Sequence, residues 1–66
     1  MAEFKSELKK YRQLAGLTQE ELASKVGVRR ETIVRLEAGR YNPSLRLAVD
    51  ISRTVGVSIE EIFIFE

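Results

Sequence analysis

Glycine divides this chain at nearly regular intervals, and the spacing limits every regular element to a short length. Five longer stretches of about 10 to 15 residues lie between the divisions. None is long enough for a linker, and no apolar run approaches the roughly 20 residues that cross a bilayer. The pattern predicts one small domain of short helices over residues 1–66. In chain order, the divisions are Gly16, Gly27, Gly39, Asn42-Pro43 and Gly56.

The small size and the missing residue types restrict what this domain can do. A core of this size rarely supplies more than about 3–5 kcal/mol of stability, so we expect oligomerisation to supplement it. Cysteine is absent, which excludes disulfides, thiolate metal sites and a cysteine nucleophile. Histidine is absent as well, which removes the commonest metal ligand and general base. We therefore expect no metal, no cofactor, no small-molecule ligand and no enzymatic activity.

Composition and charge indicate a globular protein with an uneven charge distribution. Hydrophobic residues make up 44% of the chain and charged residues 32%, and residues 1–5 lack the apolar region of a secretory signal. We therefore expect a cytoplasmic protein that does not enter membranes. The net charge is only +1, but residues 29–40 carry four arginines against two glutamates, whereas Glu60, Glu61 and Glu66 make the tail acidic. This arrangement favours one cationic face.

Helical periodicity and capping residues predict five helices. Ser6, Thr18, Ser44 and Ser58 each precede an amphipathic stretch as potential N-caps, and TQEE and SIEE, which begin at Thr18 and Ser58, are capping boxes. The predicted helices cover residues 7–15, 18–26, 30–38 and 45–55, and a brief fifth helix begins at Ser58. The apolar positions expected on the fourth helix are Leu45, Leu47, Ala48, Ile51 and Val55.

An apolar run, IFIF at residues 62–65, follows the start of the predicted fifth helix. A domain this small cannot cover both faces of such a run, so we interpret residues 58–66 as a dimerisation segment. If the run is extended, a short C-terminal strand would pair across a two-fold axis. Residues 1–5 either form a strand beside this tail or fray. The expected interface residues are Ile59, Ile62, Phe63, Ile64 and Phe65.

The second and third stretches form a recognisable motif, because two short capped helices joined by a turn at Gly27 are the parts of a helix-turn-helix. Residues 17–44, LTQEELASKVGVRRETIVRLEAGRYNPS, resemble the Cro/CI (XRE) family of helix-turn-helix transcriptional regulators. Arg12 and residues 56–63 extend the similarity to about 50 of the 66 residues. The resemblance implies an all-α, five-helix, lambda-repressor-like fold with its helix-turn-helix at about residues 18–38. It also implies a prokaryotic or phage-like source.

The resemblance further implies that the third helix enters the major groove while the second lies across the DNA backbone. Side chains on the exposed face of the third helix would contact bases, with arginine suited to guanine. These expected base contacts are Arg30, Glu31, Thr32, Val34 and Arg35. Residues at the start of the second helix, in the turn and in the following loop would contact phosphates. These are Thr18, Gln19, Arg29, Arg40, Tyr41 and Asn42.

Several of these residues have a structural alternative. Thr18 can act as a cap alone, and Asn42 can serve only the turn before Pro43. Arg29 occupies a position where relatives often have a small hydroxylated cap; since arginine cannot cap, we expect the third helix to fray at its start until DNA is bound. Arg12 and Glu37 fall on inward faces, and the family pattern suggests a structural ion pair between them in preference to DNA contacts.

The sequence thus predicts a homodimeric regulator, most simply a repressor, that binds a pseudo-palindromic site in double-stranded DNA. An alternative is an antitoxin or adaptor that acts through protein contacts of its apolar tail. Antitoxins of this fold usually carry extra segments for the toxin, and this sequence ends after the fifth helix, which favours the first hypothesis. The two hypotheses differ in whether the protein acts mainly by binding DNA or mainly by binding a protein partner.

Overall fold

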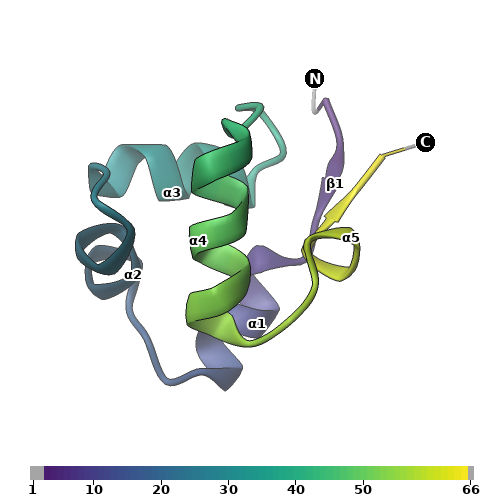
Figure 1. The fold of residues 1–66 in the computed structure, drawn as a ribbon. Helices are drawn as coiled ribbons and strands as arrows, with labels where there is room; N and C mark the ends of the chain where they lie inside the picture. The colour runs from purple at the N-terminus through teal and green to yellow at the C-terminus, as the bar shows by residue number, and fades with distance from the viewer. Residues whose placement is uncertain (1–2, 66) are drawn as a thin grey trace.

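Five helices and one pair of short strands make up the computed structural model, which describes residues 3–65 (Figure 1). The four longer helices and the brief fifth one agree with the sequence prediction to within about a residue at each end. In chain order the elements are β1 (Lys5–Ser6), α1 (Leu8–Leu14), α2 (Gln19–Val26), α3 (Arg30–Glu37), α4 (Leu45–Val55), α5 (Ile59–Ile62) and β2 (Phe63–Ile64).

Three of the four expected caps form, at Thr18, Ser44 and Ser58, whereas the N-cap of α1 is Glu7, which makes no side-chain cap, in place of the expected Ser6. At Ser58 the Glu61 carboxylate accepts from the serine hydroxyl at 2.9 Å in place of the serine amide, so the second capping box does not form as predicted. At α2 the Thr18 hydroxyl accepts from the Glu21 amide at 3.0 Å, and the Glu21 carboxylate accepts from the Thr18 amide at 2.9 Å. Ser44 accepts from the Leu47 amide at 3.1 Å at the start of α4. Gly27 ends α2 with a φ of 74°, a left-handed conformation that favours glycine. These local interactions determine where the turn of the helix-turn-helix lies.

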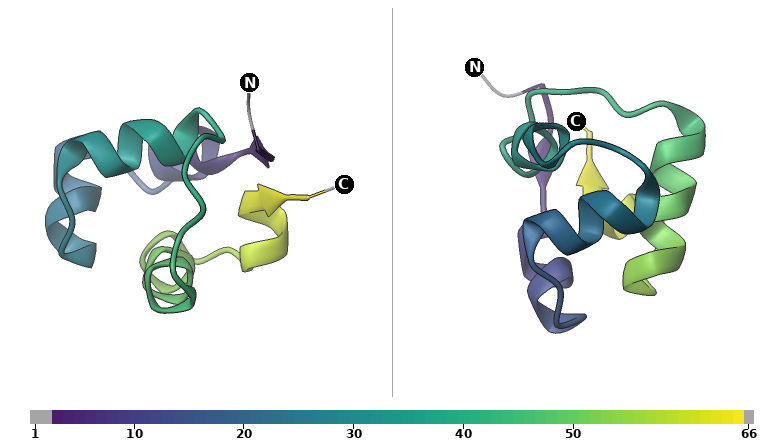
Figure 2. Two further views of the ribbon diagram at one scale, coloured as in Figure 1. Left: turned by 90° about the horizontal axis from the view of Figure 1, so that it is seen from above. Right: turned by 90° about the vertical axis from the view of Figure 1, so that its left-hand side faces the viewer.

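The helices pack around α4, which stands in the middle of the molecule (Figure 1). Figure 2 shows α2 and α3 at one end and α5 with the two strands at the other. One face of α4 therefore contributes to the core, with Leu47, Ala48 and Ile51 buried. The remaining members of this core come from every other helix and from both chain ends: Phe4, Leu8, Leu22, Ala23, Ile33, Leu36, Ile62 and Phe63.

The strand pair corrects the expectation of strand pairing across a two-fold axis. β2 pairs with β1 of the same chain, antiparallel, with Lys5 opposite Ile64 and Ser6 opposite Phe63. Phe4 packs edge-on against Phe63, with ring centroids 5.5 Å apart, and against Phe65 at 5.1 Å. A nearby strand within the chain satisfies the backbone of β2 at less entropic cost than a second molecule would. Of the two options for the N-terminal residues, the strand is therefore the one that forms; residues 1–2 lie outside the described part.

Leu45 does not contribute to the core. It is 78% exposed, although it is one of the apolar positions expected on the fourth helix. At 3.6 residues per turn, Leu45 lies about 100° from the centre of the face formed by Leu47, Ala48, Ile51 and Val55. Helix geometry therefore directs Leu45 away from the core.

None of the helices within residues 3–65 has both the length and the apolar character that a membrane span requires.

Candidate nucleic-acid interface

The outer face of α3 carries the side chains predicted to contact bases. Arg30, Glu31 and Arg35 are exposed, and Val34 is 42% exposed. Thr32 is half-buried at the edge of this face, whereas Ile33 and Leu36 anchor the opposite side in the core. Eight residues at 1.5 Å each make α3 about 12 Å long. The structure thus places all five expected base-contact residues on or beside one solvent-facing surface.

This surface is more basic than its sequence suggests. Glu37, one of the two glutamates in residues 29–40, is nearly buried, with a side chain only 8% exposed, and its charge is paired inside the molecule. Within residues 29–40, four exposed arginines then remain against one exposed glutamate, Glu31, and Glu20 of α2 lines the same hollow as Arg29 and Arg30. The arginines are Arg29, Arg30, Arg35 and Arg40. Folding itself therefore concentrates positive charge on this side, which suits a polyanionic ligand.

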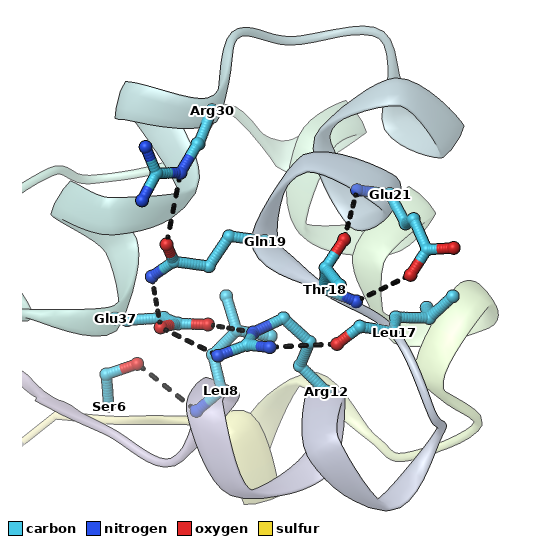
Figure 3. Close-up of polar contacts among 9 residues, drawn as sticks. All are labelled: Ser6, Leu8, Arg12, Leu17, Thr18, Gln19, Glu21, Arg30 and Glu37. Carbon is cyan, nitrogen blue, oxygen red and sulfur yellow. Dashed lines mark hydrogen bonds and ion pairs between the residues drawn. The ribbon is translucent and has the colours of Figure 1, made fainter.

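Arg12 and Glu37 form the ion pair that the sequence suggested. The Arg12 Nε lies 2.5 Å from the Glu37 Oε2, and the guanidinium also donates to the Leu17 carbonyl at 2.8 Å (Figure 3). Their side chains are only 9% and 8% exposed. The pair joins α1 to the end of α3 and lies too deep to contact DNA.

Gln19 has a role that the sequence did not reveal. Its Nε2 donates to the Glu37 Oε1 at 3.0 Å, and its Oε1 accepts from the Arg30 Nε at 3.3 Å (Figure 3). The amide thus connects the buried ion pair to Arg30 at the surface of α3. Because Arg30 uses its Nε for this contact, its two Nη groups are left to bind an acceptor outside the molecule.

The start of α2 keeps part of its capacity to bind a phosphate. The Thr18 hydroxyl oxygen and the Glu21 amide are used in the capping box, so Thr18 does act as a cap, and its phosphate contact stays a prediction. The amides of Gln19 and Glu20 make no hydrogen bond within residues 3–65. Hydrogen bonds from the Thr18 backbone and hydroxyl lower the pKa of the Glu21 carboxyl below its ordinary value of 4.5. Glu21 therefore stays ionised as part of the cap.

Arg29 and the loop after α3 flank the same surface. Arg29 is exposed and, as expected, makes no side-chain cap to α3. Arg40 and Asn42 are exposed, and Tyr41 is 40% exposed. The Gly39 carbonyl accepts from the Glu3 amide at 2.6 Å, which ties the beginning of this loop to the N-terminal segment. All three loop residues are accessible to a ligand that lies along α3.

The expected dimer-interface residues do not share one environment. Ile62 is fully buried and Phe63 is 3% exposed, because both belong to the core of their own chain. Their side chains are thus unavailable to a second copy, which corrects the sequence assignment. Ile59 and Ile64 are half-buried, and Phe65 is 61% exposed. Only these three can contribute to a surface contact.

Comparisons with known proteins agree with this geometry. Residues 8–62 match the helix-turn-helix family model HTH_3. An uncharacterised HTH-type transcriptional regulator of Archaeoglobus fulgidus is 58% identical over 62 residues, which cover 94% of this chain and 89% of the relative.

Two solved structures share the fold and 30% sequence identity, and each alignment covers 82% of this chain. The clp gene regulator ClgR from Corynebacterium glutamicum gives a TM-score of 0.74, although the chain spans only 57% of its length. The restriction-modification controller protein C.AhdI from Aeromonas hydrophila gives 0.72, with 82% of its length covered. The chain belongs to the HTH_3 helix-turn-helix family, the XRE or Cro/CI family of DNA-binding transcriptional regulators.

Proposed function

We propose that this protein is a sequence-specific repressor that binds a pseudo-palindromic operator as a homodimer in the cytoplasm. The observation that carries the proposal is the exposed face of α3, where two arginines flank an acidic and an apolar side chain. Arginine donates two hydrogen bonds to guanine, a carboxylate accepts from cytosine, and an aliphatic side chain contacts the thymine methyl group. Such a mixture has the means to distinguish base pairs.

Phosphate contacts would orient α3 in the groove. The free amides at the start of α2 and the cations Arg29 and Arg40 lie on either side of the base-reading face. Tyr41 and Asn42 add two hydrogen-bonding side chains in the loop. Gln19 then acts mainly as a positioning residue for Arg30, since both ends of its amide are already hydrogen-bonded within the chain.

A dimer accounts for affinity and for repression. One copy neutralises only a few phosphates, while two copies on successive major grooves, about 34 Å apart, raise the number to roughly 6–10. Two bound copies also cover the DNA beneath them, which blocks its use by other proteins.

Selection from a random duplex library, followed by anisotropy titrations across a salt series, tests this function. We expect the selected sites to contain two inverted half-sites about 10 base pairs apart, and binding to weaken with a log-log salt slope of about −0.9 per phosphate contacted. Arg35→Ala should relax selection at one position of each half-site, while the exposed Lys9→Ala on α1 serves as a matched control for loss of a cation. Selection of no common sequence, together with salt-independent binding, would contradict the proposal.

A further inference from the structure

A hollow of about 510 Å³ lies between α2 and α3, beside the residues expected to contact bases. Ala23 and Val28 contribute apolar side chains from α2 and the turn, and Val34 contributes one from α3. Ala23 is buried and Val28 half-buried, so the core holds both in place. Arg30 and Glu31, both exposed, add opposite charges at the rim. The hollow thus places an apolar surface between charged groups, which suits the edge of a base that carries a methyl group.

We propose that this hollow recognises 5-methylcytosine, so that methylation of one cytosine in each half-site strengthens binding to the operator. The Glu31 carboxylate accepts from the 4-amino group of the base, and Val34 contacts its 5-methyl group. The proposal rests on the function proposed above and specifies which modified base the surface of α3 accepts.

Glu31 requires a hydrogen-bond donor in the major groove. It lies in the first turn of α3, is exposed, and makes no hydrogen bond or ion pair within residues 3–65. If no donor met it on DNA, the carboxylate would lose its water and gain only the repulsion of acceptor atoms and phosphates. The donors that the major groove offers are the amino groups of cytosine and adenine. The base that faces Glu31 is therefore one of these two.

Val34 distinguishes cytosine from adenine. It lies three positions after Glu31, so the two side chains are neighbours on the surface of α3. In cytosine, ring position 5 is bonded directly to the carbon that carries the amino group, so a methyl group at position 5 stands beside the donor. In an A·T pair, the O4 acceptor of thymine separates the adenine amino group from the thymine methyl group. A carboxylate next to an apolar side chain therefore matches a pair that contains 5-methylcytosine.

The guanine paired with this cytosine suits the arginines of the same face. Gln19 accepts from the Arg30 Nε at 3.3 Å, which leaves both Nη groups for the O6 and N7 acceptors of a guanine. Arg35 lies four positions after Glu31 and adds a second cation beside it. These cations offset the repulsion between Glu31 and the phosphates, so the carboxylate can approach the base.

Parallel selections identify the base that faces Glu31. One random duplex library is amplified with unmodified cytosine and the other with 5-methylcytosine in both strands. We expect wild type to select the same half-site from both libraries and Glu31→Gln to relax the choice of base at one position, a cytosine in wild type. Glu60→Gln is the matched control, since Glu60 is also an exposed glutamate in the first turn of a helix but does not line the hollow.

Anisotropy titrations with synthetic operators then measure the preference for the methyl group. The identified cytosine is left unmodified, methylated at position 5 or replaced by a thymine paired with adenine. One buried methyl group should strengthen binding about four-fold, and two half-sites together about sixteen-fold. Thymine should bind about five-fold more weakly than 5-methylcytosine at each half-site, because its O4 meets the Glu31 carboxylate. A 5-methylcytosine placed between the half-sites controls for general effects of methylation on the duplex.

Val34→Ser tests which side chain senses the methyl group. Val34 is on the surface, so we expect the fold to be retained, and circular dichroism checks this. The ratio of the dissociation constants for unmodified and methylated operator should fall to about one in Val34→Ser, whatever the absolute affinity of the variant. Lys9→Ala, which changes an exposed residue of α1, should keep the ratio of wild type.

Equal binding of unmodified and methylated operators by wild type, equal binding of thymine and 5-methylcytosine, or a methyl preference that survives Val34→Ser would each overturn the proposal. A base other than cytosine at the position that Glu31→Gln relaxes would overturn it as well. Failure of the proposed function looks different, since wild type would then select no common sequence from either library.

Discussion

Removal of the Glu37 carboxylate is expected to destabilise the fold by about 3–5 kcal/mol. In Glu37→Ala, the Arg12 guanidinium stays in an environment where its side chain is 9% exposed, and of its recorded contacts only the Leu17 carbonyl remains as an acceptor. Gln19 loses the acceptor of its Nε2 at the same time. A domain of this size has a total free energy of unfolding of about 3–10 kcal/mol, so the variant should be close to unfolding at 25 °C.

A second variant separates the cost of an unpaired charge from the net contribution of the pair. When Arg12→Met and Glu37→Leu are combined, neither charge is buried alone, and we expect stability within about 1 kcal/mol of wild type or above it. Together with the single variants Arg12→Met and Glu37→Leu, the double-mutant cycle gives a coupling energy of several kcal/mol, which is characteristic of a desolvated pair.

Urea unfolding followed by far-ultraviolet circular dichroism at 25 °C measures these differences, at several protein concentrations because self-association shifts the midpoint. Glu60→Ala serves as the control, since Glu60 is exposed and its loss should change stability by less than about 0.5 kcal/mol. A loss below 1 kcal/mol for Glu37→Ala would place the ion pair in the range of solvent-exposed pairs and refute the argument from burial.

Three further perturbations follow from the same geometry. Hydrogen bonds from Thr18 lower the pKa of Glu21 in the folded state, so the carboxylate contributes stability above pH 4.5. This stability is lost as the pH falls through the folded pKa. In Glu21→Gln, the free energy of unfolding should therefore decrease less steeply at acidic pH than in wild type. Arg40→Ala should weaken binding to every duplex alike and reduce the salt slope by about 0.9 per bound copy, or about 1.8 for a dimer. Arg35→Ala should instead cause a selective loss of about 1–3 kcal/mol at one base pair of each half-site; anisotropy measures both effects. Gly27→Ala should cost about 1–2 kcal/mol in thermal unfolding through its φ of 74° alone, since a Cβ there meets nothing within 4 Å, and Gly27→Asn should cost less.

Features set by local interactions were predictable from the sequence. The capping box at Thr18, the cap at Ser44 and the turn at Gly27 each involve residues within a few positions of one another, so their spacing alone marks the helix ends. Helical periodicity likewise placed Ile33 and Leu36 inside and the α3 residues expected to contact bases outside.

Features that depend on distant parts of the chain were harder to predict, and the Arg12–Glu37 pair was suggested only by the family pattern. Two-residue strands show no alternation, so the sequence left open whether residues 1–5 form a strand beside the tail and did not indicate that Lys5 pairs with Ile64. The contact between Gln19 and Glu37 spans 18 positions and joins residues that each had a plausible separate role. Leu45 was grouped with the apolar positions of α4 by residue type, although its angle on the helix separates it from them.

The strand pair has a consequence for how the protein is made. During synthesis, Phe4 leaves the ribosome well before the residues that it contacts, since the Glu7 amide bonds to the Ile62 carbonyl and Phe4 packs on Phe63 and Phe65. The helix-turn-helix can assemble around α4 earlier, because its contacts are closer in sequence. Helices α2 and α3 of the nascent chain can therefore pack together before the strand pair closes the core around Phe4.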